Sequence, residues 1–245
     1  MSTFAQSAAT ALQLVITPDP GLWAIVGRSL AVSGVACLLA CGIGLVAGAW
    51  LGVARFALRG AVLTLLNTLL AVPSVVVGLV VYLLLSRSGP LGSLGWLFSF
   101  KAMVVAQCIL VLPVVSALTR QVVEDADRAH GEQLQSLGAR PLMRSVLLAW
   151  DERYALLTVL IAAFGRAISE VGAVMVVGGN IDGFTRVMTT AIALETSKGD
   201  LPLALALGLV LLGVVLALNA VIALVRRWRE GVEGDSGAIL SGVGA

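Results

Sequence analysis

Long apolar stretches separated by short polar segments dominate this chain and restrict the folds open to it. A helix that crosses a membrane needs about 20 apolar residues. Five stretches reach roughly that length: Arg28–Ala54, Ala61–Leu85, Ala102–Thr119, Tyr154–Gly178 and Leu201–Val225. Only 12% of the 245 residues are charged, against about 25% in a soluble domain. We therefore predict an all-α membrane protein with five transmembrane helices, forming a single domain over residues 1–245 with its core at 28–225.

The two ends of the chain lie outside these stretches. Ala8–Ile16 is apolar but too short to span a membrane, so we expect an interfacial helix that lies on the membrane surface. Met1–Asp19 contains no Lys or Arg, which is unlike the start of a cleaved secretory signal. The Gly-rich segment Glu230–Ala245 predicts a flexible tail.

The basic residues indicate how the spans are oriented, because cytoplasmic loops carry an excess of Lys and Arg. One side of the predicted topology holds Arg55, Arg59, Arg120, Arg128, Arg140, Arg144, Arg153, Arg226, Arg227 and Arg229. The other side holds Arg28, Arg87, Lys101, Arg186 and Lys198, and Arg166 lies inside a span. The larger set predicts a cytoplasmic C-terminus and an external N-terminus in the cytoplasmic (inner) membrane.

Gln121–Arg153 is the one long polar interval between apolar spans. We expect a helix at about Ala126–Leu137 that ends at Gly138, a residue suited to a left-handed helix cap. Pro141 suits the first turn of a second helix, where its missing N–H has no partner to lose. An ordered loop of this length is usually functional, so we interpret the interval as a cytoplasmic docking surface. A passive solvated connector is the alternative.

Small residues and prolines mark positions of close packing and helix distortion. A small residue recurs at every fourth position of the first span, at Ala36, Ala40, Gly44, Gly48 and Gly52. Such a ladder lets two helix backbones approach closely, either within the chain or against a second copy. A proline in the middle of the second span and another in the third, Pro73 and Pro113, should each kink the helix. The kinks indicate either fixed curvature or a hinge.

The fourth span combines an apolar stripe with two charged residues. The stripe consists of Leu157, Ile161, Phe164, Ile168, Val171 and Met175. Arg166 and Glu170 are four residues apart, so they can pair on one helix face, and a lone charge there would be costly. Together with Ser169 they form a membrane-embedded pair that either braces the helix or lines a translocation path. A carboxylate by itself would repel an anionic substrate.

Several classes of function are disfavoured by what the sequence lacks. It contains no Gly-x-x-x-x-Gly-Lys-Ser/Thr segment, so we expect no ATP-binding loop and no catalytic residues. The net charge of +2 is too small to suggest a nucleic-acid partner. Cys37 and Cys41 share an apolar face without a His or acid nearby, so we expect packing residues and no metal site. The single His, His130, is interpreted as a surface residue.

The polar interval resembles the cytoplasmic loop of the permeases of binding-protein-dependent ABC importers. Glu132 and Gly138 hold the Glu and Gly of that loop motif, six positions apart, whereas Gln133 and Leu134 replace its two small residues. In that family the loop docks into a cleft of the ATP-binding subunit. The resemblance assigns this coupling role to Glu132, Gly138, Ala139, Arg140 and Pro141.

A second resemblance is to the oxyanion branch of these permeases, which import molybdate, tungstate or sulfate. It is carried by the run from Gly165 to Ala173, which reads GRAISEVGA, and by Gly178-Gly179-Asn180. The run from Thr185 to Asp200 is most similar to tungstate permeases. The resemblance implies the type I importer architecture, a homodimer in membrane lipid, two cytoplasmic ATP-binding subunits and an extracytoplasmic oxyanion-binding protein. ATP and Mg would be bound by the partner subunit and no cofactor by this chain.

We therefore predict the permease subunit of an ABC importer for an oxyanion. The predicted substrate is tungstate, and molybdate and sulfate are the alternatives. We also expect a gate region at Gly172, Gly178, Gly179 and Asn180. The rival from another class is a self-contained secondary transporter that uses Arg166 and Glu170 to couple protons. Secondary carriers often contain internal repeats, and we find none in this sequence.

Overall fold

The computed structural model describes residues 2–17 and 19–241, and these form helices and connecting loops without a β-strand. The helices are α1 (Ser2–Ile16), α2 (Pro20–Val53), α3 (Arg59–Ala71), α4 (Ser74–Leu85), η1 (Gly92–Leu94), α5 (Phe100–Ser136), α6 (Pro141–Asp151), α7 (Arg153–Ile168), α8 (Gly172–Gly178), α9 (Met188–Lys198) and α10 (Leu201–Ser241). The predicted all-α class is confirmed for this part of the chain.

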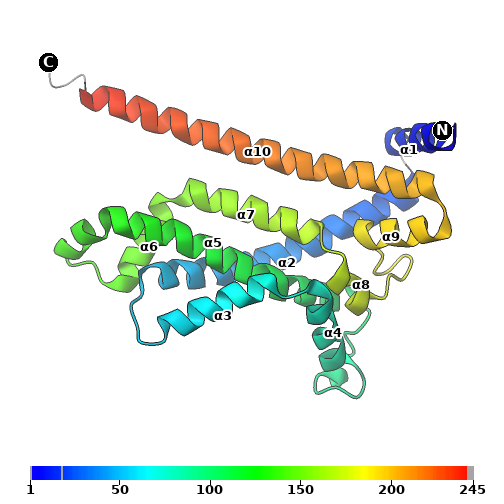
Figure 1. Cartoon of the computed structure of the whole chain (residues 1–245), viewed down its shortest axis with the longest axis horizontal. Coiled ribbons are helices and arrows are strands. Elements are labelled where there is room, and N and C mark those ends of the chain that lie inside the picture. The colour runs from blue at the N-terminus through cyan, green and yellow to red at the C-terminus, as the bar shows by residue number, and fades with distance from the viewer. Residues whose placement is uncertain (1, 18, 242–245) are drawn as a thin grey trace.

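Three of these helices, α2, α5 and α10, are long and apolar enough to cross a membrane. Two further spans arise only if each of two bent pairs counts as one: α3 with α4, bent by 98°, and α7 with α8, bent by 55°. The predicted spans Ala61–Leu85 and Tyr154–Gly178 therefore each consist of two helices separated by a break. Figure 1 shows α4 turning away from the long axis that α3 follows.

Pro73 explains the first of these breaks. Val72 adopts an extended conformation (φ −64°, ψ 128°), and Pro73 serves as the N-cap of α4. Proline lacks an N–H and disfavours the helical region for the residue before it. The expected kink is therefore a full interruption of the helix. Pro113, by contrast, lies inside α5, which continues through it.

The third span continues into the polar interval without interruption. We expected a separate short helix at about Ala126–Leu137, but α5 is one helix of 37 residues that ends at Ser136. Arg120, Glu124 and Arg128 are spaced four apart, and both arginines pair with Glu124 along the helix surface. Such pairs stabilise a helix that leaves the membrane. The sequence showed where the helix changes from apolar to polar, but the backbone conformation does not change at that point.

The small-residue ladder of α2 packs against α5 within the same chain. A Cβ added to Gly48 would lie 2.5 Å from the Ser116 carbonyl oxygen and 2.7 Å from the Thr119 Cβ. Gly44 faces Val115 and Gly52 faces Val123 in the same way. The two long helices thus pack almost backbone to backbone, which resolves the choice between an internal contact and a second copy for these glycines.

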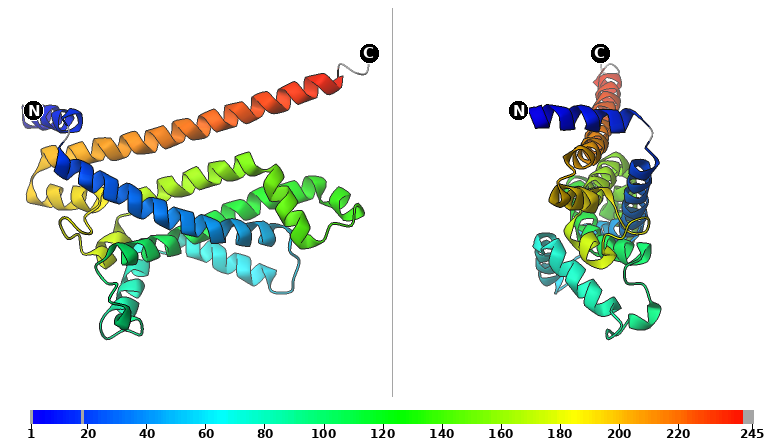
Figure 2. Two further views of the ribbon diagram at one scale, coloured as in Figure 1. Left: turned by 180° about the vertical axis from the view of Figure 1, so that it is seen from behind. Right: turned by 90° about the vertical axis from the view of Figure 1, so that its right-hand side faces the viewer.

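The N-terminal helix packs on the start of α10. Ala11 of α1 shares a buried apolar cluster with Leu22 and Ile25 of α2 and with Leu207 of α10. Figure 2 shows α1 lying across the bundle beside that end of α10. α1 and α9 lie at one end of the bundle, and the α5–α6 turn and the end of α10 lie at the other (Figure 1).

The backbone of α10 is helical to Ser241. The predicted flexible tail at 230–245 is thus helical over 230–241 in this structure. Its remaining part, residues 242–245, lies outside the described residues.

Candidate functional site

The turn between α5 and α6 has the geometry that its residues predict. Gly138 has φ +81° and donates its N–H to the Gln135 carbonyl, and Ala139 donates to the Leu134 carbonyl. These two bonds define a Schellman motif, which needs a left-handed residue after the helix. α6 then begins at Pro141 as expected. Local sequence therefore determines a compact turn at the end of the bundle.

This turn presents apolar side chains to the surroundings. Leu137 is 82% exposed, and Leu142 and Met143 are also exposed. Of the residues assigned to docking, Gly138, Ala139, Arg140 and Pro141 form the turn itself. Glu132 lies about a turn and a half earlier on α5, also at the surface. An exposed apolar tip on a protein is typical of a surface that binds a partner.

A buried ion pair holds α6 against α5. The Arg144 Nη2 atom lies 2.8 Å from Asp127 Oδ1 and 3.0 Å from Asp127 Oδ2, and each side chain is only 7% exposed. Arg144 Nε is buried without a hydrogen-bond partner among the described residues. Sequence reasoning missed this pair, because Arg144 stands among apolar residues of α6 and 17 positions from Asp127.

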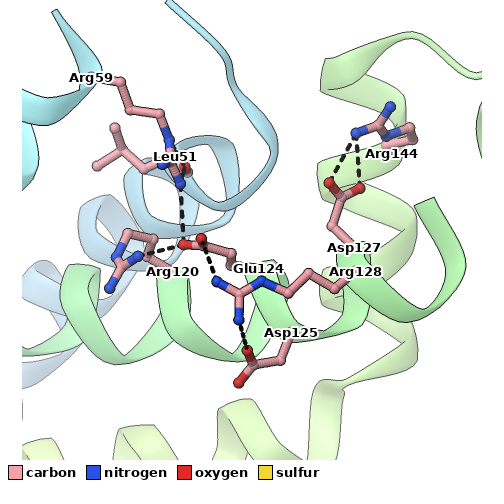
Figure 3. A network of polar contacts seen from close by, with 8 residues as sticks. All are labelled: Leu51, Arg59, Arg120, Glu124, Asp125, Asp127, Arg128 and Arg144. Atoms are coloured by element: carbon pink, nitrogen blue, oxygen red, sulfur yellow. Dashed lines mark hydrogen bonds and ion pairs between the residues drawn. The ribbon is translucent and has the colours of Figure 1, made fainter. Parts of the chain in front are cut away.

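A second cluster lies nearby, where one carboxylate binds three arginines (Figure 3). Glu124 of α5 is contacted by Arg59 Nη2 at 3.1 Å, by Arg128 Nη2 at 3.0 Å and by Arg120. Arg59, at the start of α3, also donates to the Leu51 carbonyl near the end of α2 at 3.2 Å. The cluster therefore joins three helices at the base of the α5–α6 hairpin.

The charge of Glu124 is held in place by these arginines. Burial alone would raise the pKa of its carboxyl, but the charges of Arg59 and Arg120 and hydrogen bonds from Arg59 and Arg128 outweigh it. The pKa therefore lies below its usual range, and the group is ionised at neutral pH.

A cavity of about 500 Å³ lies between the end of α2 and the hairpin. Its lining includes Arg55, Glu132, Pro141 and the Asp127–Arg144 pair. The buried ion pair thus forms part of the wall of this cavity.

The break between α7 and α8 gathers the polar residues of the fourth span. Arg166 Nη1 donates to Glu170 Oε2 at 2.9 Å, so the predicted pair forms. Glu170 is not on the same continuous helix as Arg166, because α7 ends at Ile168. The expected apolar stripe likewise divides there, since Val171 lies in the break and Met175 on α8.

Side chains from other helices hydrogen-bond the backbone at this break. Gln107 of α5 donates to the Ala167 carbonyl at 3.0 Å, and Thr189 of α9 donates to the Glu170 carbonyl at 2.7 Å. The N–H of Ala173 donates to Glu170 Oε1 at 3.3 Å. Irregular backbone at membrane depth is tolerated only where such partners are available. This break is therefore built by tertiary contacts.

The residues assigned to a gate lie around α8. A Cβ on Gly172 would lie 2.6 Å from a Val75 methyl group, and a Cβ on Gly178 would lie 2.8 Å from Met103 Sδ. Gly179 (φ +68°) and Asn180 (φ +51°) turn the chain back, and Asn180 Nδ2 donates to the Thr190 carbonyl. The glycines thus mark close approaches of α8 to α4 and α5.

Comparison with known proteins identifies the family. No protein-family model matches the chain. A tungstate uptake system permease protein, TupB of Peptoclostridium acidaminophilum, is 41% identical over 222 residues, covering 91% of this chain and 97% of its own. This chain belongs to the family of ABC importer permeases for oxyanions.

Two further relatives support the same family assignment. An anion ABC transporter permease of Haloferax volcanii is 40% identical over 88% of this chain and 94% of its own. TupB of Campylobacter jejuni is 41% identical over 67% of this chain and 69% of its own. Permeases named for molybdenum and sulfate transport are more distant.

The permease also contains buried polar residues that sequence reasoning missed. Ser29, Ser33, Gln107, Thr185 and Thr189 are all buried. Each follows or precedes apolar residues and carries no charge, so nothing in the pattern distinguished it from a core position. A signal was available only in the geometry, because Ser29 accepts the N–H of Met188 across 159 positions of sequence.

Proposed function

We propose that this permease translocates tungstate across the cytoplasmic membrane as the transmembrane subunit of an ATP-driven importer. The observation that carries the substrate assignment is the 41% identity to TupB over 91% of this chain. Molybdate and sulfate are the alternatives, since the permeases named for them are related but more distant.

The substrate can be tested on the assembled importer. Tungstate, molybdate and sulfate, each delivered with the binding protein, are compared for uptake into proteoliposomes and for stimulation of ATP hydrolysis. Titration of the isolated binding protein with the same three anions shows whether selection occurs before delivery. Uptake of sulfate in preference to tungstate would contradict the assignment.

In this proposal each bent helix pair counts as one membrane span, which makes five. The hairpin and the C-terminus are cytoplasmic, the N-terminus is external, and α1 lies on the outer membrane surface. Support comes from the bias of basic residues and from the placement of α1 and the α5–α6 turn at opposite ends of the bundle (Figure 1). In a variant without the native cysteines, an impermeant thiol reagent applied to intact cells should label Ser88→Cys but not Ser136→Cys.

The hairpin is proposed as the coupling element that docks on the ATP-binding subunit. Its exposed tip at Leu137, Leu142 and Met143 supports this role, as does its firm attachment to α5 through Arg144. Because α5 is one helix from Phe100 to Ser136, movement of the tip is transmitted directly into the membrane. Two permease copies and two ATP-binding subunits would then rock the central path from outward- to inward-facing.

ATP and Mg belong to the partner subunit in this scheme, and an external binding protein delivers the anion. The region around Gly172, Gly178, Gly179 and Asn180 is the proposed gate, because α8 packs tightly there and is joined to α7 by an irregular segment.

The rival function is a secondary transporter that couples protons through Arg166 and Glu170. Reconstitution distinguishes the two. The permease alone should carry no tungstate into liposomes under a proton gradient, and uptake should require the ATP-binding subunit, the binding protein and ATP. Gradient-driven uptake by the permease alone would favour the rival.

A further inference from the structure

Arg166 and Glu170 form one ion pair but occupy opposite environments. The Arg166 side chain is 50% exposed, whereas the Glu170 side chain is 4% exposed. Arg166 is 13 residues beyond the start of α7 at Arg153, which places it about 20 Å along the helix at 1.5 Å per residue. In a hydrocarbon core of about 30 Å the exposed guanidinium lies too deep to be explained as a residue of the cytoplasmic surface.

The exposed guanidinium keeps most of its donors available. An arginine carries five N–H donors, and Arg166 directs Nη1 to Glu170 Oε2. Its exposed neighbours are small or polar, because Ala162 lies about one turn earlier on α7 and Ser169 directly follows the end of α7, and both are exposed. Hydrocarbon cannot satisfy such donors, so this face requires water, an anion or another protein surface.

Glu170 does not oppose an anion at this face. Its Oε2 binds Arg166, and its Oε1 accepts the Ala173 N–H. The carboxylate is buried behind the arginine and bound from the protein side. An ion approaching α7 from the exposed side therefore meets the guanidinium first.

We infer that Ala162 and Arg166 of α7, together with Ser169 just after its end, line the translocation path and that Arg166 is a transient ligand of the oxyanion. This inference rests on the proposed function. A guanidinium suits this task because its planar donors match the oxygens of an oxyanion and it stays charged at all relevant pH. Glu170 orients the side chain and offsets part of its charge, which keeps binding weak enough for release, as conduction requires.

The first test measures water access and electrostatic sign at this face. Ser169→Cys is made in a background in which Cys37, Cys41 and Cys108 are replaced by Ala, and the complex is treated with small anionic or cationic thiosulfonates. We expect both reagents to react. When each rate is divided by the rate of the same reagent with a free thiol in solution, the anionic reagent should be the faster one. Tungstate, added with ATP and the binding protein, should slow the anionic reaction. The control is Leu38→Cys, at a 75% exposed apolar site on α2, which we expect to face lipid and to react with neither reagent.

No reaction at Ser169→Cys would overturn the inference, because the face would then contact lipid or a second copy of the chain. Faster reaction with the cationic reagent would overturn it as well.

The second test separates an anion ligand from a structural brace. In the double variant Arg166→Gln with Glu170→Gln, both charges are removed, so that no buried carboxylate is left unpaired. We expect the maximal rate of tungstate uptake to fall about tenfold or more, while the KM for the loaded binding protein stays unchanged, because Arg166 acts after delivery.

Uptake at the wild-type rate in this double variant would reduce Arg166 to a brace and overturn the inference. Failure of the proposed function is distinguishable, because the unmodified complex would then show no ATP-dependent tungstate uptake at all.

Discussion

Arg144 of α6 points inward to Asp127 of α5, and the two side chains form an ion pair in which each is only 7% exposed. Leu142, Val146 and Trp150 of α6 are each more than 60% exposed, whereas Leu148 is buried in an apolar cluster with Val123 and Ala126 of α5. The α5–α6 hairpin is therefore closed by an ion pair and an apolar contact, and α6 keeps a second apolar face exposed. Such an exposed apolar face fits an element that lies between the membrane and a partner protein.

We predict that breaking this pair on one side destabilises the permease more than removing it entirely. Arg144→Met leaves a buried carboxylate without its partner, which typically costs about 3–5 kcal/mol. Arg144→Met combined with Asp127→Leu should recover most of that loss. Thermal unfolding in detergent measures both, and co-purification with the ATP-binding subunit reports on the hairpin. A double variant less stable than the single one would contradict this interpretation.

Contact between α2 and α5 should depend on Gly48 far more than on a nearby glycine of the same helix. Gly48→Ala places a methyl group 2.5 Å from the Ser116 carbonyl oxygen, and such overpacking costs about 1–3 kcal/mol. Gly42→Ala is the matched control, because no described atom lies within 4 Å of the added carbon. The melting temperature should fall for Gly48→Ala and stay level or rise for Gly42→Ala. Equal effects would place the close contact elsewhere.

Substitutions at Gly138 should act through the backbone alone. No described atom lies within 4 Å of a Cβ at this position, but its φ is +81°. Gly138→Val should therefore cost about 1–2 kcal/mol or more, whereas Gly138→Asn, which tolerates the left-handed region, should cost less. We expect normal membrane insertion for both variants.

The functional consequence of Gly138→Val is weakened binding of the ATP-binding subunit, or retained binding with loss of tungstate uptake. Co-purification and uptake are measured side by side for the Val and Asn variants. Wild-type uptake by Gly138→Val would remove the turn geometry from the coupling mechanism.

Glu124 should make the stability of the permease depend on pH in the acid range. Its pKa is lower in the folded state than its ordinary value. The contribution of Glu124 to the free energy of unfolding is therefore complete above the unfolded-state pKa of about 4.3. This contribution is lost as the pH falls through the folded-state pKa. The difference in melting temperature between wild type and Glu124→Gln should be constant from pH 7 to about 5 and shrink below about 4.3.

Asp125→Asn is the control for this prediction, because the Asp125 side chain is 73% exposed and pairs only with Arg128 among the described contacts. Exposed pairs contribute little to stability, so this variant should follow wild type at every pH. If Glu124→Gln were as stable as wild type at pH 7, the ion pairs between Glu124 and the three arginines would contribute nothing to stability.

The sequence by itself determined the class of the protein and the position of the turn between α5 and α6. Long apolar stretches predicted an all-helical membrane protein, since hydrocarbon demands that each backbone N–H and C=O be bonded within the segment. Gly138 and Pro141 predicted the turn between α5 and α6, because a left-handed cap and a helix start depend on one or two residues. Family motifs around Glu132 and from Gly165 to Asn180 indicated the oxyanion permease that the comparisons confirm.

Only the tertiary structure decided where helices are interrupted and which faces meet. Nothing in Ser169-Glu170-Val171 breaks a helix by itself, and side chains from distant helices hold the break, since Gln107 donates to the Ala167 carbonyl and Thr189 to the Glu170 carbonyl. The small residues of α2 predicted a close helix contact but did not identify the partner helix, which is α5. Local conformation depends on neighbouring residues in the chain, whereas helix partners and buried ion pairs depend on the fit of surfaces that are far apart in the sequence.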